Sequence, residues 1–396
     1  MLASYFRKPQ RLVVGLMSGT SLDGVDAAIV RIGGQGLDTK VELVHYTAVS
    51  YDDTLREKLK DLCSLDRSNV AMVCGMNFYL GRVFAEAVRL AAAEAGLSMD
   101  EIDLVSSHGQ TVWHIPEANP SEWCQVRSTL QIGDLSVIAK QTGKPVVGDY
   151  RTADMAVGGQ GAPLVPYADF ILFRDASKGR IAQNIGGIGN CTAIPAGGLP
   201  EEVIAFDTGP GNMLIDEAVY QLSGGAKSYD DGGAWAAQGR ADDSLLDRML
   251  SHPYFALKPV KTTGREMFGK PYAAEWIGEA RRLGLADADI VATFTAFTAR
   301  SIAAGYRDFV FPVCRAEEVI VSGGGAHNRT LLRMLAGLLP EQRVLTSDAF
   351  GISGDAKEAI AFALFANNFL HGIPNQLPSA TGASRPAVMG KLALPE

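Results

Sequence analysis

The feature that most constrains the fold is a pattern that occurs twice: an apolar strand, a glycine-rich turn and a second strand. The first copy predicts a buried strand at Arg11–Ser18, the turn GTSLDG, and a return strand at Asp26–Arg31. The second copy begins about 170 residues later, with a strand at Arg180–Ile185, the turn GGIGN and a return at Cys191–Ile194. Such recurrence indicates an internal duplication, although two glycine-rich turns could also coincide by chance.

Further strands and helices follow each opening, so both halves mix hairpins with β-α-β crossovers and predict an α/β fold. In the first half we expect strands at Val41–Val49, Ile102–Ser106 and Pro145–Val147 and helices at Cys74–Gly96 and Leu135–Gln141. In the second half we expect strands at Val203–Phe206, Val319–Ser322 and Arg343–Leu345 and helices at Met213–Leu222, Tyr272–Arg282, Asp287–Ala304, Arg329–Leu338 and Lys357–Phe369.

Length and charge exclude several classes of protein. The chain has 396 residues, 36 Lys and Arg against 44 Asp and Glu, and a net charge of −8. Its length fits two or three domains. The acidic balance argues against a general nucleic-acid binder, which would carry a basic field. No segment reaches the ~18 consecutive apolar residues of a membrane span, and Met1–Gln10 lacks the apolar core of a signal peptide.

The cysteines are odd in number, widely spaced and without a CxxC pair. They therefore predict neither a disulfide framework nor a zinc site, but scattered thiols in a reducing cytoplasm. They are Cys63, Cys74, Cys124, Cys191 and Cys314.

Glycine clusters beside strands let backbone N–H groups approach a phosphate. The four candidate clusters are Ser18–Gly24, Gly186–Asn190, Thr208–Asn212 and Gly323–Gly325. No GxGxxG follows a strand, and the segment nearest to a P-loop, Gly264–Lys270, has Pro271 where a Ser or Thr would hold magnesium. The hairpin loop Ser18–Gly24 could wrap a triphosphate or be a plain tight turn. Beside it, Asp23 and Asp26 could hold Mg²⁺ through water, although Asp26 could equally be a strand-edge residue.

The segment Phe206–Asn212 (FDTGPGN) places Asp207 at the end of a predicted strand, just before a glycine turn and a helix. Ligands bind at such strand ends in α/β sheets. A carboxylate there can act as a general base or lie in the shell of a magnesium ion. The alternative is that Asp207 caps the helix, but Asn212 is the better candidate for that N-cap.

Four other polar side chains follow predicted strands or open a helix. His108 and His114, six residues apart, have poor metal-binding geometry, so we favour sugar contacts or ordinary structural histidines. Arg151 could hold a carboxylate with its planar fork or form a surface salt bridge. Glu358 opens the last helix, where it could bind a ligand or favour the helix dipole.

The order and spacing of seven motifs resemble those of the anhydro-N-acetylmuramic acid kinase family, and together they cover nearly the whole chain. The motifs are GLMSGTSLDGVD (Gly15–Asp26), SHGQT (Ser107–Thr111), QIGD (Gln131–Asp134), GGQGAPLVP (Gly158–Pro166), NIGGIGN (Asn184–Asn190), FDTGPGN (Phe206–Asn212) and SGGGAHN (Ser322–Asn328). No single motif is decisive, but the set is specific.

The resemblance implies a duplicated actin-like ATPase fold, related to ribonuclease H, with two lobes around a central cleft. Residues 1–165 would form the first lobe, and 166–396 the second, with the end of the chain near 357–396 able to pack back on the first. It also implies a cytoplasmic enzyme, a tendency to form homodimers, and a place in the recycling of peptidoglycan fragments. Residues 1–10 receive no role.

Members of this family use ATP and one water to open the 1,6-anhydro ring of their sugar and phosphorylate O6. By resemblance, Asp207 is the catalytic base, Mg²⁺ accompanies ATP, and Gly323–Gly325 support the adenosine. The residues expected at the ATP phosphates are Ser18, Gly19, Thr20, Ser21, Leu22, Asp23, Gly24, Val25, Gly186, Gly187, Thr208, Gly209 and Gly211. Those expected at the sugar are His108, Gln110, Thr111, Arg151 and Glu358.

Two other functions remain open at this point. A conventional sugar or carboxylate kinase of the same fold would phosphorylate an existing hydroxyl without adding water to the anomeric carbon. A non-enzymatic ATP-dependent scaffold would need a peptide-binding domain or polymer contacts, and the chain has no spare domain for the former.

Overall fold

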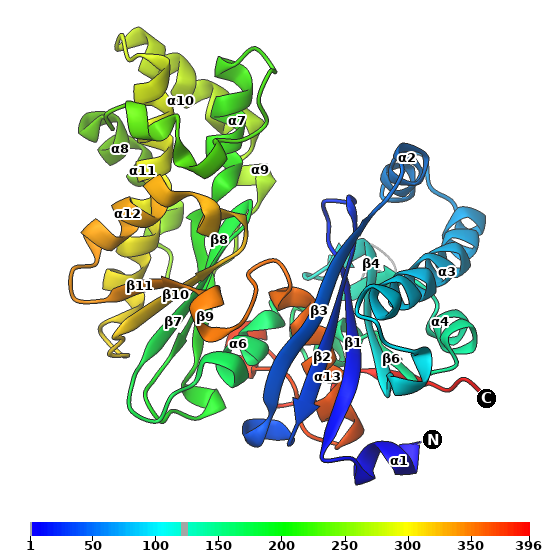
Figure 1. The fold of residues 1–396 in the computed structure, drawn as a ribbon. Coiled ribbons are helices and arrows are strands. Elements are labelled where there is room, and N and C mark those ends of the chain that lie inside the picture. Colours follow the sequence, from blue (N-terminus) through cyan, green and yellow to red (C-terminus); the bar gives the residue numbers. More distant parts are fainter. Residues whose placement is uncertain (1, 120–125) are drawn as a thin grey trace. The chain divides into compact units, whose positions relative to one another are not determined.

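The computed structural model describes residues 2–119 and 126–396, which divide into two units with their own sheets and cores. The first unit runs to Leu172 and takes back Ala356–Glu396, and the second is Phe173–Asp355. The sequence analysis drew this boundary after residue 165 and left the place of the last helix open. That helix, α13 (Lys357–Leu370), packs on strands β1, β2 and β4 of the first unit (Figure 1). Cys124 lies outside the described residues.

The first unit is built on a sheet with the strand order β12-β6-β4-β1-β2-β3, and β5 pairs with the outer part of β4. Its strands are β1 (Gln10–Ser18), β2 (Gly24–Gly33), β3 (Lys40–Ser50), β4 (Leu104–Ile115), β5 (Ser128–Ile132), β6 (Val146–Gly148) and β12 (Lys391–Ala393). Its other helices are α1 (Leu2–Arg7), α2 (Asp53–Leu62), α3 (Val70–Glu94), α4 (Leu135–Thr142), α5 (Arg151–Ala156), α6 (Val165–Phe173, which reaches the boundary) and α14 (Pro378–Thr381).

The second unit is built on a sheet with the order β11-β10-β7-β8-β9. Its strands are β7 (Arg180–Ile185), β8 (Ile188–Ile194), β9 (Ile204–Pro210), β10 (Glu318–Ser322) and β11 (Arg343–Thr346). Its helices are α7 (Asn212–Leu222), α8 (Asp243–Leu250), α9 (Arg265–Phe268), α10 (Lys270–Arg282), α11 (Asp287–Gly305) and α12 (Arg329–Leu338).

The two sheets share one topology. In each, the first three strands form an antiparallel meander, β1-β2-β3 in one and β7-β8-β9 in the other. In each, the first strand also pairs in parallel with the fourth, β4 or β10, which pairs in parallel with the next, β6 or β11. The predicted duplication is therefore present in the structure, and the predicted actin-like α/β fold is confirmed.

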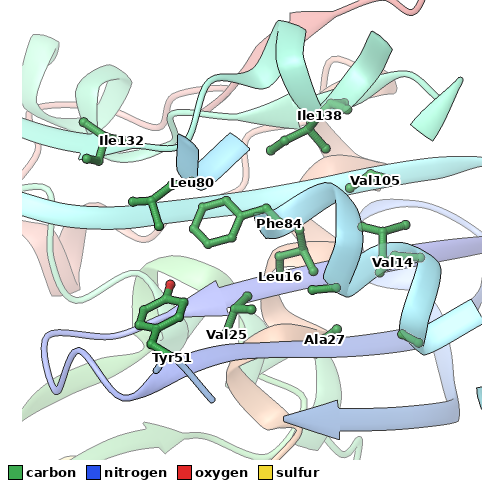
Figure 2. Close-up of a cluster of buried hydrophobic side chains, with 14 of the residues drawn as sticks. Val14, Leu16, Val25, Ala27, Tyr51, Leu80, Phe84, Val105, Ile132 and Ile138 are labelled. Atoms are coloured by element: carbon green, nitrogen blue, oxygen red, sulfur yellow. The ribbon is translucent and has the colours of Figure 1, made fainter. Parts of the chain in front are cut away.

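Helices cover both faces of the first sheet because alternate residues of a strand point to opposite sides. Val14 and Leu16 face α3, whose Leu80 and Phe84 form one apolar stripe of the buried cluster (Figure 2). Gly15, between them, faces α13, and a Cβ there would lie 1.9 Å from the carbonyl oxygen of Ala359. Glycine thus lets α13 lie directly against β1.

Several local predictions were wrong in their bounds. β4 continues past Ser106 to Ile115 because β5, which was not predicted, pairs with it. β9 continues past Phe206 to Pro210 because it stays paired with β8. Gly211, not Asn212, is the N-cap residue of α7, and no side chain caps that helix.

No helix within residues 2–119 and 126–396 combines the length and the apolar character that crossing a bilayer requires.

Candidate active site

The turn between β1 and β2 is anchored by buried side chains at its base. Ser18 Oγ lies 2.8 Å from the carbonyl oxygen of Gly24, 2.7 Å from Tyr51 Oη and 2.7 Å from Gln110 Oε1. Gln110 Nε2 donates to the carbonyl oxygen of Gly19 at 2.9 Å. Gln110 is fully buried, and its amide holds the turn. Its contact with the sugar stays a prediction.

The tip of the same turn offers unused backbone donors. The N–H groups of Thr20, Ser21 and Leu22 have no acceptor in the described part of the chain. Leu22 adopts a left-handed φ of 58°, and its side chain is buried in the core of the first unit. Free N–H groups in a tight turn form a concave site for an anion such as phosphate. The side chains of Leu22 and Val25 lie in the core, so only their backbone could serve such a site.

The two carboxylates predicted to hold magnesium lie at this turn and in the strand that follows it. Asp23 is exposed and accepts a hydrogen bond from Ser21 Oγ at 2.7 Å, while Asp26 in β2 accepts one from Tyr46 Oη at 2.7 Å. Among residues 2–119 and 126–396 no group of three or more acidic, His or Cys side chains could hold a metal ion directly. Binding through water, the arrangement predicted from the sequence, stays a prediction.

His108 links the turn to Arg151. Its Nδ1 lies 3.2 Å from the carbonyl oxygen of Ser18, and its Nε2 accepts from Arg151 Nε at 2.9 Å. Burial, reinforced by the Arg151 charge, lowers the pKa of His108 to about 3, so the ring is neutral. A neutral ring that accepts at Nε2 donates from Nδ1, which matches both contacts.

Arg151 also donates from Nη1 to the carbonyl oxygen of Gly161 at 2.6 Å. Burial lowers the pKa of Arg151 to about 10, and the nearby carboxylates of Glu358 and Asp154 oppose that shift. Arg151 therefore lies within an ordered network and not in a surface salt bridge, which excludes the alternative left open above.

Glu358 lies in the first turn of α13, and burial raises the pKa of its carboxyl group, opposed by the charges of Lys357 and Arg151. Thr111 is less constrained, and its Oγ1 accepts from Gln131 Nε2 at 3.2 Å. His114 is half-buried, with its Nδ1 3.1 Å from Thr129 Oγ1, and burial together with the charge of Arg151 lowers its pKa. The first unit thus groups His108, Arg151 and Glu358, with His114 near Arg151.

The turn between β7 and β8 in the second unit is held by backbone groups. The carbonyl oxygens of Gly186 and Gly187 accept the N–H groups of Asn212 and Gly211 at 2.7 and 2.8 Å. A Cβ on Gly211 would lie 2.3 Å from the carbonyl oxygen of Gly186. The N–H of Gly187 has no acceptor within the described residues, so it is the donor of this turn that a phosphate could use.

Thr208, Gly209 and Gly211 are part of this backbone arrangement. Thr208 is buried in β9, with its Oγ1 3.4 Å from Gln183 Nε2, and Gly209 pairs with Gly189 of β8. The carbonyl oxygen of Gly211 accepts from Thr298 Oγ1 of α11 at 2.8 Å. These contacts position the turn and the start of α7 next to it.

Gly323–Gly325 follow β10, beside a pocket of about 770 Å³ that lies wholly within the second unit. Gly324 contributes to its wall, together with Asn212, Tyr229 and Asn328. Asp216 also lines it, and burial together with the charge of Asp230 raises the pKa of Asp216 to about 6. The pocket stands where the sequence placed the adenosine, but Asp216 itself was missed because nothing in its local sequence distinguishes it.

Asp207 lies in mid-β9, opposite Asn190 of β8, and not at the end of a strand as predicted. Its Oδ2 accepts from the backbone N–H of Thr263 at 2.9 Å, while no donor in the described part of the chain reaches Oδ1. Burial, together with the charge of Glu266, raises the pKa of Asp207 to about 6. Since the side chain caps no helix, that alternative is excluded.

The segment that begins with Thr263 continues into Gly264–Lys270, the part that the sequence analysis considered only as a possible P-loop. It leads from a short turn into α9 and α10, no strand precedes it, and it contacts β9 instead. The P-loop alternative is therefore excluded, as the sequence argued. The role of this segment beside Asp207 was missed because it depends on a contact between residues 56 positions apart.

A family model described as anhydro-N-acetylmuramic acid kinase matches residues 11–395. The chain belongs to this family. The kinase of that name from Caldanaerobacter subterraneus subsp. tengcongensis is 47% identical over 99% of this chain and 99% of its own length. The kinase of that name from Bacillus cereus (strain AH820) is 46% identical over 97% of this chain and 99% of its own.

Members of the anhydro-N-acetylmuramic acid kinase family are phosphotransferases, so this chain is an enzyme of that class. Among solved structures, (R)-2-hydroxyglutaryl-CoA dehydratase component A from Acidaminococcus fermentans covers 91% of this chain with 99% of its own, at 13% identity. Its TM-score is 0.47, a likeness too low to add to the family assignment.

Proposed function

We propose that this chain opens the 1,6-anhydro ring of anhydro-N-acetylmuramic acid and phosphorylates O6 at the expense of ATP. Water adds to the anomeric carbon and gives up a proton to Asp207 while the bond from that carbon to O6 breaks. O6 then attacks the γ-phosphorus as the bond to the β,γ-bridging oxygen breaks. The products are N-acetylmuramic acid 6-phosphate, ADP and one proton.

The observation that supports this proposal most is the state of Asp207. One oxygen is held by the N–H of Thr263, the other has no donor among the described residues, and the pKa is raised to about 6. A base works best when its pKa lies near the operating pH, because it is then both ionised and basic enough to take a proton. A substrate without a free 6-hydroxyl needs a base that activates water.

We assign the polar network of the first unit to the sugar. Neutral His108 uses one ring nitrogen for the carbonyl oxygen of Ser18 and the other for Arg151, so it holds the guanidinium group in place. The remaining guanidinium N–H groups of Arg151 suit the lactyl carboxylate of the sugar, since a guanidinium fork matches two carboxylate oxygens. Glu358, close enough for its charge to act on Arg151, would bind sugar hydroxyls.

We assign the free N–H groups of the β1–β2 turn and of Gly187 to the ATP phosphates, and the 770 Å³ pocket to the adenosine. Mg²⁺ would be held through water by Asp23 and Asp26, since this ion keeps most of its hydration shell. The metal would neutralise charge on the transferring phosphoryl group. We further propose that the enzyme acts in the cytoplasm, where ATP is available, as a homodimer in the recycling of peptidoglycan fragments.

One assay tests the reaction. The protein is incubated with the anhydro sugar, MgATP and oxygen-18 water, and the phosphorylated product is examined by mass spectrometry. We expect one labelled oxygen at the anomeric carbon. Phosphorylation without label would identify a conventional sugar kinase, and ATP binding without any product would identify a scaffold. Either result contradicts the proposal.

The role of Asp207 is tested by Asp207→Asn, which keeps the shape and can still accept from Thr263. We expect turnover to fall by at least about 10³-fold, because the amide cannot take the proton of water. ATP affinity, measured by calorimetry, should stay within twofold. Asp243→Asn, an exposed substitution at the start of α8, is the control and should leave both unchanged. Near-normal turnover of Asp207→Asn would remove Asp207 from the mechanism.

A further inference from the structure

The strand that carries Asp207 lies at the edge of its sheet, and the segment from Tyr254 to Thr263 covers its free side. The N–H of Asp207 donates to the carbonyl oxygen of Lys261 at 3.1 Å. Tyr254 Oη donates to the carbonyl oxygen of Asp207 at 2.6 Å, and Thr263 N–H holds Oδ2. One segment therefore fixes the backbone of Asp207 on both sides and one of its carboxylate oxygens.

The side chain of Lys261 lies inside this segment and not in solvent. Only 6% of Lys261 is exposed, and Nζ lies 4.8 Å from the ring centre of Tyr254 and 4.7 Å from that of Phe309. Nζ also donates to the carbonyl oxygens of Tyr254 and Phe255, at 3.4 and 3.2 Å. No carboxylate in the described part of the chain forms an ion pair with it.

These contacts tie the two ends of the Tyr254–Thr263 segment together. The ammonium of Lys261 binds carbonyl groups six and seven residues earlier, so both ends of the stretch that touches Asp207 are tied to one cation. Burying an ammonium group is costly unless it is hydrogen-bonded, and aromatic faces recover part of that cost. A lysine that only filled space would be replaced favourably by an apolar side chain.

We propose that Lys261 is a positioning residue for the proposed base: its buried ammonium holds residues 254–263 against β9 and so orients the Asp207 carboxylate toward water. This inference rests on the proposed role of Asp207. It concerns a side chain that touches neither the sugar nor ATP in the assignment above, and it acts through the hydrogen bonds of Thr263 and Tyr254.

The charge of Lys261 also affects Asp207 directly. The groups that face Asp207 are Glu266 of α9, whose charge raises its pKa, and Lys261, whose charge lowers it, with the hydroxyl of Tyr254 near its backbone. Lys261 is itself near Asp308 and Cys191, whose charges oppose the lowering of its pKa by burial. Loss of the ammonium should therefore raise the pKa of Asp207.

The test compares Lys261→Met, which keeps length and apolar contact, with Lys258→Met, an exposed lysine of the same segment. We expect Lys261→Met to lower kcat by about 10²-fold, since a misplaced reacting group has an effect of that order. KM for both substrates should stay within twofold, and the acidic limb of the kcat–pH profile should move to higher pH. Lys258→Met should match the wild type.

Tyr254→Phe removes only the hydroxyl that Asp207 accepts from and keeps the ring beside Lys261. It should lower kcat several-fold without changing either KM, and it serves if Lys261→Met fails to fold. If either variant has the same kcat and the same acidic limb of the kcat–pH profile as Lys258→Met, the inference is overturned, even if the melting temperature falls. Absence of anhydro-sugar phosphorylation in the wild type would instead overturn the proposed function.

Discussion

The two sheets share a strand order but hold their first turns by different means. In the first unit, the β1–β2 turn is fixed by side chains of Ser18, Gln110 and Tyr51. In the second, the shorter β7–β8 turn is fixed by backbone hydrogen bonds from the start of α7, where Gly211 leaves no space for a side chain. The same topology thus supports two candidate phosphate sites. Loss of a side chain should disturb the first turn, whereas an added Cβ should disturb the second.

The two units also differ in the chemistry that their candidate site residues can perform. The side chains of the first unit form a buried network with a neutral His108 and a charged Arg151, which suits binding of a fixed polar ligand. The second unit provides Asp207, a carboxylate of the edge strand β9 whose pKa is raised to about 6. The two sheets share a topology, but these residues lie at different places on it: Asp207 is on the third strand of its sheet and His108 on the fourth strand of the other.

Among the tests of this contrast between the two turns, the largest effect should come from a methyl group on the backbone-held turn. Gly211→Ala places a Cβ 2.3 Å from the carbonyl oxygen of Gly186, so the turn or α7 must move. We expect kcat/KM for ATP to fall by about 10²-fold or more and the melting temperature to drop, since overpacking costs about 1–3 kcal/mol. Steady-state kinetics and calorimetry measure both.

Gly278→Ala is the matched control, because this exposed glycine of α10 has no atom near the position of a Cβ. It should be neutral or stabilising by up to about 1 kcal/mol. Normal ATP kinetics in Gly211→Ala would show that the second turn tolerates side chains and that the contrast between the units does not hold.

The next effect concerns the side chain that holds the first turn. Gln110→Leu leaves the carbonyl oxygen of Gly19 without its donor and removes one partner of Ser18 Oγ. A buried polar group left unpaired costs about 1–3 kcal/mol, so we expect KM for ATP to rise about tenfold and stability to fall by that amount. Gln10→Leu, exposed at the start of β1, should change neither. Wild-type ATP kinetics in Gln110→Leu would contradict the support role.

The smallest effect is a gradual dependence of kcat on pH, which compares Asp207 of the second unit with His108 of the first. Asp207 must be ionised to take a proton, so kcat should fall tenfold per pH unit below about pH 6, where its raised pKa lies. His108, with a pKa lowered to about 3, should add no second limb between pH 5 and 8. A kcat profile over that range checks this, and a steeper, two-proton decline would show that a second group also titrates, such as Asp216 or Glu358, whose pKa values are raised as well.

Local sequence predicted much of the molecule. The repeated strand-turn-strand openings, most strands, the longest helices and the glycine clusters could be found because period and turn residues are properties of short segments. Asp207 stood out for the same reason, as a carboxylate beside a glycine turn. The predicted ends of β4 and β9 were wrong because each strand continues only where a distant partner, β5 or β8, pairs with it.

The sequence by itself thus determined the duplicated α/β architecture, the family, and which residue types are available for chemistry. The tertiary structure decided which of these residues lie close together. It placed the Gln110 amide against the β1–β2 turn, put α13 with Glu358 in the first unit, and placed Lys261 beside Asp207. Burial, charge and hydrogen bonding act between residues that are close in space, and most of these pairs lie far apart along the chain.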